Sequence, residues 1–193
     1  QAIIASHGTN MYSEGGGGLP VTTDDGLSWT TLISEPPMER CFPDYRLEVL
    51  SDSVLFAQCY MGLFRSSDGG RSWNRIPSPH IYFSQMLPDP AGGVLVTAKD
   101  TASANYQLLR VSYDGSTVEA IGPGPFWGDV PAGILLDSGD FLAANVESSK
   151  SIMRSTDGGR TWVSTTGIRA AVSDFCQCPD GTVFAAKIGR AHV

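Results

Sequence analysis

Charge is scarce in this chain, and the little there is forms no cationic surface. Asp, Glu, Lys and Arg make up only 17% of the 193 residues, against about a quarter in an average protein. The 13 basic residues are outnumbered by 20 acidic ones, which gives a net charge of −7, and no cluster of lysine or arginine occurs. Binding to a nucleic-acid backbone needs a basic footprint. The composition therefore argues against a nucleic-acid partner.

Long hydrophobic runs and metal-binding spacings are also missing. No stretch approaches the roughly 20 apolar residues that span a bilayer, so we expect no membrane insertion. The 3 histidines are isolated from one another, and no His or Cys spacing fits a metal site. The glycine run at 15–18 lacks the Lys-Ser/Thr of a phosphate-binding loop. The sequence therefore predicts neither a metal nor a cofactor.

The 4 cysteines leave the redox state open. Cys41 and Cys59 flank one expected hairpin and would form a disulfide in an exported protein if the strand register brought them together. Cys176 and Cys178 lie on one face of an expected strand, which is typical of core filling. We favour free, mostly buried cysteines.

Turn-forming residues, in contrast, are abundant. The chain holds 22 glycines and 12 prolines, above the average combined share of roughly 12%. Its hydrophobic content of 41% is ordinary. This combination indicates many short strands rather than long helices or disorder.

An internal repeat organises these strands. Three segments follow the pattern Ser/Thr-x-Asp-x-Gly-x-Ser-Trp or its Thr-Trp variant, and a fourth is one residue shorter and has no Trp. The aspartates recur every 43 to 46 residues, and an apolar run after a tight turn precedes each motif. Each period then holds four short strands, which is the period of a propeller blade. The repeated residues are Asp24 with Trp29, Asp68 with Trp73, Asp157 with Trp162, and Asp114 alone.

The motif resembles the Asp-box, or BNR repeat, of sialidases, sortilin-like receptors and xyloglucanases. The resemblance implies an all-β fold: a β-propeller with four-stranded antiparallel blades and Asp-box turns. It covers nearly the whole chain, as about four to five blades of an original six to eight. We expect one partial propeller over residues 1–187, with blade repeats at roughly 1–35, 36–78, 79–122, 123–166 and 167–187. By resemblance, the protein is extracellular or periplasmic.

Both ends of the sequence indicate a fragment. The chain begins with Gln1 in an apolar run, without an initiator Met or a signal peptide. Residues 188–193 resemble the translation of a widely used sequencing adapter, so we expect them to be a non-native tail. On this interpretation, the remaining blades of the propeller are missing from this chain.

We expect the repeated aspartates to be structural. A short carboxylate in a tight turn can accept backbone N–H groups, the glycines tolerate a positive φ, and the Trp can bury its face between blades. The competing interpretation is a calcium loop, which needs about six to eight oxygen ligands, and each motif offers one certain carboxylate.

Strand alternation separates two ends of the propeller. The turn after the first strand and the Asp turn share one end, and the longer loops share the other. Residues of those longer loops that lie outside the repeat are the binding candidates, since residues found in every blade are architecture. An aromatic face beside a carboxylate suits a sugar subsite, although Trp127 could equally fill space between blades. The candidates are Trp127, Asp129, Arg46, Tyr45, Asp44, His80 and Tyr82.

The catalytic set, if there is one, cannot be named from this segment. Tyr45-Arg46-Leu47 is similar to the Arg motif of sialidases, but Glu48 stands where that motif has Pro. An inverting glycoside hydrolase needs two carboxylates about 6.5 to 9.5 Å apart, and the acids of the longer loops are Asp44, Asp100, Asp129 and Glu147.

Three functions stay open. The first is a binding or scaffold module that recognises glycan or protein. The second is part of a carbohydrate-active glycoside hydrolase, sialidase-like or xyloglucanase-like. The third is a receptor-type propeller that binds peptide.

Overall fold

The computed structural model describes residues 3–4, 18–33, 46–59, 62–78, 82–99, 106–123, 132–144, 152–165, 167 and 172–187. Within these ranges the chain forms strands and turns and no helix. A membrane-crossing helix is accordingly not found in the described part of the chain. The expected tail at 188–193 lies outside it.

The described strands form five antiparallel sheets that follow one another along the chain, and each strand pairs with the next. Sheet 1 has three strands and sheet 5 has two, while sheets 2, 3 and 4 have four each. The predicted all-β class with four-stranded antiparallel sheets is thus confirmed. Sheet 1 contains β1 (Ile3–Ile4), β2 (Gly18–Thr22) and β3 (Thr30–Ile33); sheet 2 contains β4 (Arg46–Val49), β5 (Leu55–Cys59), β6 (Gly62–Ser66) and β7 (Asn74–Arg75); sheet 3 contains β8 (Tyr82–Pro88), β9 (Val94–Lys99), β10 (Tyr106–Val111) and β11 (Val118–Pro123); sheet 4 contains β12 (Gly133–Leu135), β13 (Phe141–Ala144), β14 (Ile152–Ser155) and β15 (Val163–Ser164); and sheet 5 contains β16 (Val172–Gln177) and β17 (Val183–Lys187).

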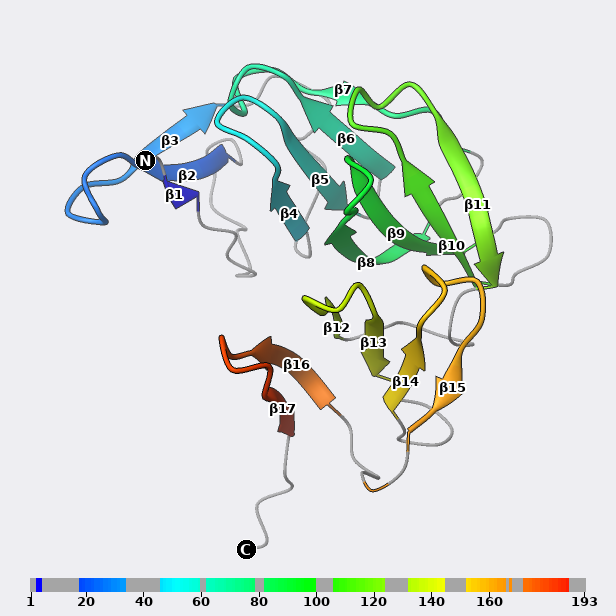
Figure 1. Ribbon diagram of the computed structural model, residues 1–193. Coiled ribbons are helices and arrows are strands. Elements are labelled where there is room, and N and C mark those ends of the chain that lie inside the picture. Colours follow the sequence, from blue (N-terminus) through cyan, green and yellow to red (C-terminus); the bar gives the residue numbers. More distant parts are fainter. Residues whose placement is uncertain are drawn as a thin grey trace, which may run out of the picture.

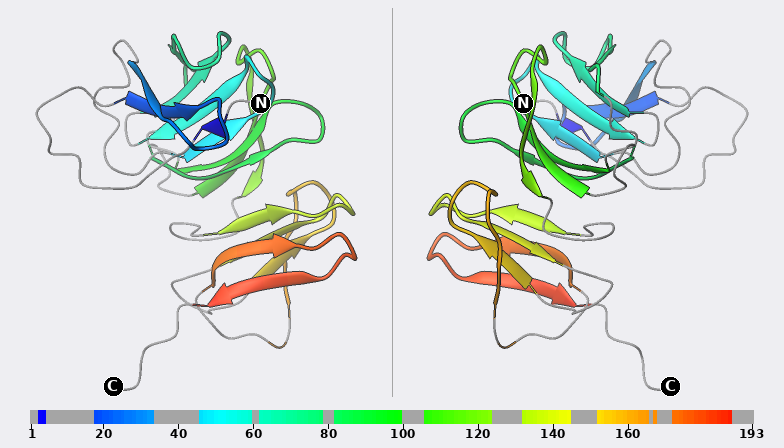
Figure 2. Two further views of the ribbon diagram at one scale, coloured as in Figure 1. Left: turned by 90° about the vertical axis from the view of Figure 1, so that its left-hand side faces the viewer. Right: turned by 90° about the vertical axis from the view of Figure 1, so that its right-hand side faces the viewer.

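The sheets are arranged around an arc (Figure 1). The first strand of each of sheets 2 to 5, which is β4, β8, β12 or β16, lies nearest the centre. The fourth strands β7, β11 and β15 lie on the outside (Figure 1). Side views show the same succession, with sheet 1 and sheet 5 at opposite ends of the arc (Figure 2).

The core lies between the sheets, so that sheet 3 is buried on both faces. Alternating side chains of a strand point to opposite faces, and both faces here need apolar residues. This explains the low charge content, because charged residues are rarely fully buried. The interface of sheets 2 and 3 contains Val54, Phe56, Leu63, Ile76, Met86, Val94, Val96, Ala98, Leu109 and Val111, and that of sheets 3 and 4 contains Leu95, Leu108 and Phe141 with Leu87, Ile121, Leu135 and Trp162.

Tight turns join the first two strands of sheets 2 to 5, and glycine is required in one of these turns. The turn of sheet 3 is closed by the Asp89 N–H, which donates to the Gly93 carbonyl at 3.0 Å. Gly93 has a φ of 90°, and a Cβ on it would lie 2.0 Å from the carbonyl oxygen of Val111. No other residue fits there.

The Asp-turns, which we define as residues 22–29, 66–73, 112–118 and 155–162, join the last two described strands of sheets 1 to 4. They lie at the same end of the sheets as the tight turns, since the Gly69 N–H donates to the Ser53 carbonyl at 2.9 Å. We call this the turn end and the opposite end the loop end. The arrangement follows from strand alternation.

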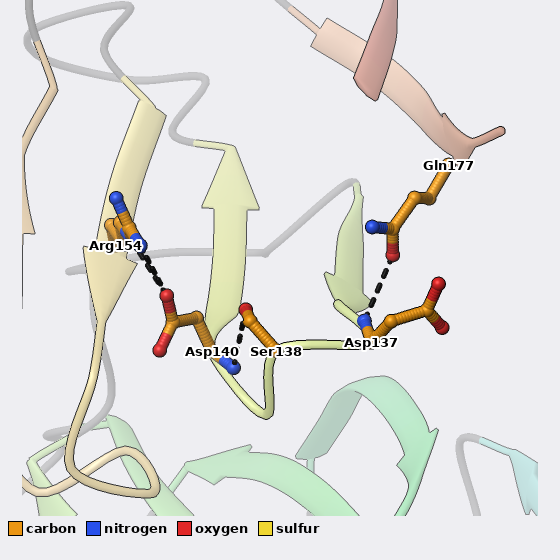
Figure 3. A network of polar contacts seen from close by, with 5 residues as sticks. All are labelled: Asp137, Ser138, Asp140, Arg154 and Gln177. Carbon is orange, nitrogen blue, oxygen red and sulfur yellow. Dashed lines mark hydrogen bonds and ion pairs between the residues drawn. The ribbon is translucent and has the colours of Figure 1, made fainter. Parts of the chain in front are cut away.

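The third strand of each four-stranded sheet carries one arginine whose guanidinium contacts a residue in a turn at the turn end. The Arg65 Nε donates to the Tyr113 carbonyl in the Asp-turn of sheet 3 at 2.8 Å. Arg110 pairs with Asp89 at 2.5 Å, and Arg154 pairs with Asp140 (Figure 3). Figure 3 also shows the Asp137 N–H donating to Oε1 of Gln177 at 2.9 Å, which links sheets 4 and 5.

The burial of the repeated tryptophans agrees with the expectation in two Asp-turns and differs from it in the first. Trp73 is 7% exposed and Trp162 packs beside Phe141, but Trp29 is 48% exposed. The later Asp-turns pack against the preceding sheet; a Cβ on Gly159, for example, would lie 2.1 Å from Cδ2 of Leu108. Trp29 is exposed because no other described sheet packs against the Asp-turn of sheet 1.

The interpretation of Cys176 as core filling is wrong. Cys176 is free and exposed, and Cys178 is free and half-buried. Cys176 lies opposite Phe184 on the sheet 5 face that points away from sheet 4, whereas Phe175 points into the core. Cys41 lies outside the described residues, as does the side chain of Cys59.

The two arginine pairs predict unequal losses of stability. The Asp89 side chain is 2% exposed, so Arg110→Met leaves a buried carboxylate without its charged partner. The expected loss in the free energy of unfolding is roughly 3 kcal/mol or more. The Arg154–Asp140 pair is more exposed, at 51% and 13% for the two side chains, so Arg154→Met is expected to cost about 0–1 kcal/mol. Denaturant unfolding of both variants measures the difference, and equal losses would contradict this account of the pairs.

Candidate functional site

The four repeated aspartates use their carboxylates within their own turns. In the second Asp-turn, Oδ1 of Asp68 accepts from the Ser72 N–H at 2.9 Å and from the Ser66 hydroxyl at 2.8 Å. Its Oδ2 accepts from the Ser72 hydroxyl at 2.6 Å. The Ser66 hydroxyl oxygen in turn accepts from the Gly70 N–H at 2.9 Å. Asp24 and Asp157 are bonded in the same way, and Asp114 accepts from Ser112 and Ser116 in the shorter turn.

These donors hold the aspartates in the charged form. A hydroxyl group, from Ser28, Ser72, Ser112 or Thr161, is the main cause that lowers the pKa of each carboxyl to about 2. Hydrogen bonds to the carboxylate favour its ionised form. Oxygens already occupied in this way are poorly placed to bind a substrate or a cation.

Most of the predicted binding residues lie outside the described part of the chain. This holds for Asp44, Tyr45, His80, Trp127 and Asp129. It also holds for the remaining loop acids, Asp100 and Glu147. The structure therefore places only two candidates, Arg46 and the backbone of Tyr82.

Those two candidates begin neighbouring innermost strands. Arg46 is the first residue of β4 and is exposed, and Tyr82 is the first residue of β8. The strands β4 and β8 lie next to each other (Figure 1). Both residues are at the loop end, where the unplaced candidate loops begin or end in the sequence.

Glu48 is a further candidate, which the sequence analysis considered only as a departure from the sialidase motif. It lies two residues after Arg46 on β4, so both side chains share one face of the strand. Glu48 is half-buried, and burial raises the pKa of its carboxyl to about 7, with the Arg46 guanidinium opposing the shift. A carboxyl that titrates near neutrality can accept hydrogen bonds or exchange protons with a ligand.

Two glutamines are buried in this part of the structure: Gln58 pairs with Arg46 and belongs to the candidate region, whereas Gln85 points toward Gly133 of sheet 4 and lies outside it. Gln58 on β5 is 3% exposed and Gln85 on β8 is 7% exposed, and the side-chain oxygen of each accepts no hydrogen bond. A sequence signal for both exists, because each Gln interrupts an apolar strand: Leu-Phe-Ala-Gln-Cys in β5 and Tyr-Phe-Ser-Gln-Met-Leu-Pro in β8. Buried polar atoms without partners are uncommon and often mark a functional position.

A metal site is not formed by the described residues. They contain no group of three or more His, Cys, Asp or Glu side chains arranged to hold an ion.

Comparison with known proteins relates this geometry to other chains. No protein-family model matches the sequence. A xyloglucanase from Paenibacillus sp is 25% identical over 167 residues, which are 82% of this chain and 14% of that protein. The chain thus spans about one seventh of the length of this relative.

Two solved structures resemble the fold. The extracellular domain of the putative hybrid two component system BT4673 from B. thetaiotaomicron has a TM-score of 0.63 at 13% identity, over 88% of this chain and 23% of that one. YCF48 bound to D1 peptide has a TM-score of 0.61 at 17% identity, over 87% of this chain and 53% of that one. These neighbours, together with four-stranded antiparallel sheets around a common centre, identify the fold as a β-propeller.

The hydrogen bonds of Asp68 predict a loss of stability on removal of its carboxylate. Asp68→Ala is expected to cost roughly 1–2 kcal/mol at pH 7, because three hydrogen bonds to the carboxylate are lost. The folded pKa lies below the ordinary value of 3.8, so the contribution is present above about pH 4 and is lost as the pH falls toward 2. Thermal unfolding at pH 7 and pH 3 measures this. Asp52→Ala removes an exposed carboxylate of the same sheet and serves as the control; equal losses in the two variants would contradict the prediction.

The raised pKa of Glu48 predicts that folding stability depends on pH in the direction opposite to that of Asp68. Its folded pKa of about 7 lies above the ordinary 4.5, so the folded state holds the proton more tightly. Stability is greatest below pH 4.5 and falls as the pH rises to about 7. Glu48→Gln is expected to be relatively more stable at pH 8 than at pH 5, measured as the difference in unfolding midpoint from the parent chain. Glu119→Gln, at an exposed position on β11, is the control; a Glu48→Gln difference that is flat between these pH values would overturn the assignment.

Proposed function

We propose that this chain is an Asp-box β-propeller segment that acts as a binding or scaffold module, with glycan or protein as its ligand. The observation that carries the proposal is the contrast between two kinds of acid. The Asp-turn carboxylates are occupied by their own turns, whereas Glu48 stands beside Arg46 on an innermost strand without a hydrogen bond from a described residue. The Asp-turns are then the structural Asp-boxes, and the loop end of the innermost strands is the binding region.

The residues of the neighbouring loops extend this region in the proposal. Tyr45, Asp44, His80, Trp127 and Asp129 precede the innermost strands β4, β8 and β12 in sequence. Aromatic rings beside carboxylates bind sugars by stacking and hydrogen bonding. The extracellular neighbour and the xyloglucanase relative support an extracellular or periplasmic location.

Glycoside hydrolysis is the second candidate function. The relative named as a xyloglucanase supports it, and a carboxyl with a pKa near 7 suits a general acid. Glu48 would need a second carboxylate, for which Asp44 and Asp129 are the candidates. Peptide binding is the third, supported by the neighbour solved with a bound peptide.

One experiment separates these functions. The parent chain is titrated by calorimetry with a neutral xyloglucan oligosaccharide and with a lysine-rich peptide, and release of reducing ends is followed in parallel. We expect saturable binding of the oligosaccharide without release of reducing ends. The Asp68→Ala variant should keep its binding per folded molecule, because Asp68 acts only within its turn.

Other outcomes have distinct meanings. Release of reducing ends that is lost in Glu48→Gln would replace the binding module with a hydrolase. Binding of the peptide alone would favour the peptide-binding propeller. Binding of neither probe would contradict the proposal for both of its ligand classes.

A further inference from the structure

Three polar side chains share one face of sheet 2 at its innermost edge. In the β4–β5 ladder, Arg46 pairs with Gln58 and Glu48 pairs with Phe56. Residues opposite each other in such a ladder project to the same face, and Phe56 lies in the core between sheets 2 and 3. Arg46, Glu48 and Gln58 therefore lie on the face of sheet 2 that packs against sheet 3, and we call this edge, where β4 lies beside β8, the seam.

Two of these side chains have hydrogen-bonding oxygens without a donor. The Oε1 of Gln58 is buried and unpartnered, and no described residue donates to Glu48. A buried acceptor without a donor costs roughly 1–3 kcal/mol. Glu48 and Gln58 are diagonal neighbours in the β4–β5 ladder, so two acceptors without donors lie close together. We interpret this pair as a site whose donors come from a ligand.

The spacing of the acceptors suits small donor groups. Glu48 and Gln58 are diagonal neighbours, whose Cβ atoms lie about 7–8 Å apart or somewhat less. A hydroxyl group or a pair of adjacent hydroxyls fits between two acceptors at that separation. Arg46 is exposed at the start of β4, which is at the loop end of the sheet.

Charge selects the class of ligand. A cation would meet the Arg46 guanidinium, and an anion would meet the Glu48 carboxylate. A sugar hydroxyl can donate to a carboxylate or an amide oxygen and can accept from a guanidinium. We propose that Arg46, Glu48 and Gln58 form a subsite for a neutral, polyhydroxylated ligand, in which Glu48 and Gln58 accept hydrogen bonds from sugar hydroxyls and Arg46 donates one. This subsite rests on the proposed binding function.

The subsite makes binding dependent on pH. An ionised carboxylate is the stronger acceptor, so bound hydroxyls favour ionisation of Glu48 and affinity rises as the pH passes through about 7. The charged groups on this face are Arg46 and, across the sheet, Arg65 on β6. The strands β5 and β8 carry no Asp, Glu, His, Lys or Arg.

Gln85 provides a matched control. Its Oε1 is also buried and unpartnered, but its side chain points toward β12 in the next sheet, with Cγ 3.5 Å from the position of a Cβ on Gly133. Gln85 pairs with Thr97 and has no carboxylate beside it in the ladder. The Gln85→Leu variant therefore removes an equivalent orphan oxygen outside the subsite.

The test is calorimetric titration of a neutral xyloglucan oligosaccharide into the full chain and its variants at pH 5.5 and pH 8. We expect Glu48→Gln and Gln58→Leu to bind roughly tenfold or more weakly at pH 8, and Gln85→Leu to bind within about twofold of the parent. The parent should bind more tightly at pH 8 than at pH 5.5, and Glu48→Gln should lose that difference. Thermal unfolding of each variant confirms that it is folded under the titration conditions.

The failures are distinguishable. If the parent binds the oligosaccharide and both subsite variants bind it equally well, the subsite is wrong and the binding function stands. If Gln58→Leu raises stability and leaves binding unchanged, the orphan oxygen is a cost to folding that the ligand does not use, and the subsite is again overturned. If the lysine-rich peptide binds instead and Glu48→Gln abolishes its binding, the ligand class is wrong. If neither probe binds, the binding function fails together with the subsite.

Discussion

The packing of one sheet face against the next is the constraint on which this structure depends. Each sheet between two others must bury both faces, as sheet 3 does through Val96 and Leu109 on one side and Leu95 and Leu108 on the other. Charged residues therefore lie in turns, loops or edge strands, or they extend their charged groups from an inner strand to the end of the sheet. The arginines follow this rule, since Arg65, Arg110 and Arg154 all reach groups at the turn end. The Asp-turn hydrogen bonds recur because each sheet packs against its neighbours in the same way.

The same constraint determines where a binding site can form. The turn end is filled by tight turns and Asp-turns whose polar groups are satisfied internally, for example the bond from Gly69 to Ser53. The innermost strands β4 and β8 of successive sheets begin at the opposite, loop end (Figure 1). Arg46 and Glu48 are polar residues on a strand whose position would otherwise favour apolar ones. They break the apolar pattern at the inner edge of sheet 2, which is the region that we propose for binding.

Much of the fold was predictable from the sequence, because the repeat encodes it locally. The apolar run after each tight turn and the motif around each aspartate predict strands such as 63–65 and 152–154, which lie within β6 and β14. The exposure of Trp29 was not predictable in this way, since its burial depends on a neighbouring sheet rather than on its own motif. Cys176 was misinterpreted because strand alternation alone does not tell which face meets the next sheet. Gln58 is similar: its side-chain oxygen is recognised as unpartnered only once sheets 2 and 3 are packed.

The acids of this chain show how the local environment moves the pKa of a carboxyl group in opposite directions. At Asp68 the turn supplies donors from Ser66 and Ser72, which stabilise the charged carboxylate. These hydrogen bonds lower the pKa of Asp68 to about 2. At Glu48 burial removes water and the fold supplies no donor in return, so the pKa rises to about 7. An acid that only held the strand in place would gain from a local donor, as all four Asp-turn aspartates do. In the proposed subsite, Glu48 and its neighbour Gln58 lack a local donor, and the hydroxyl groups of the ligand would supply it.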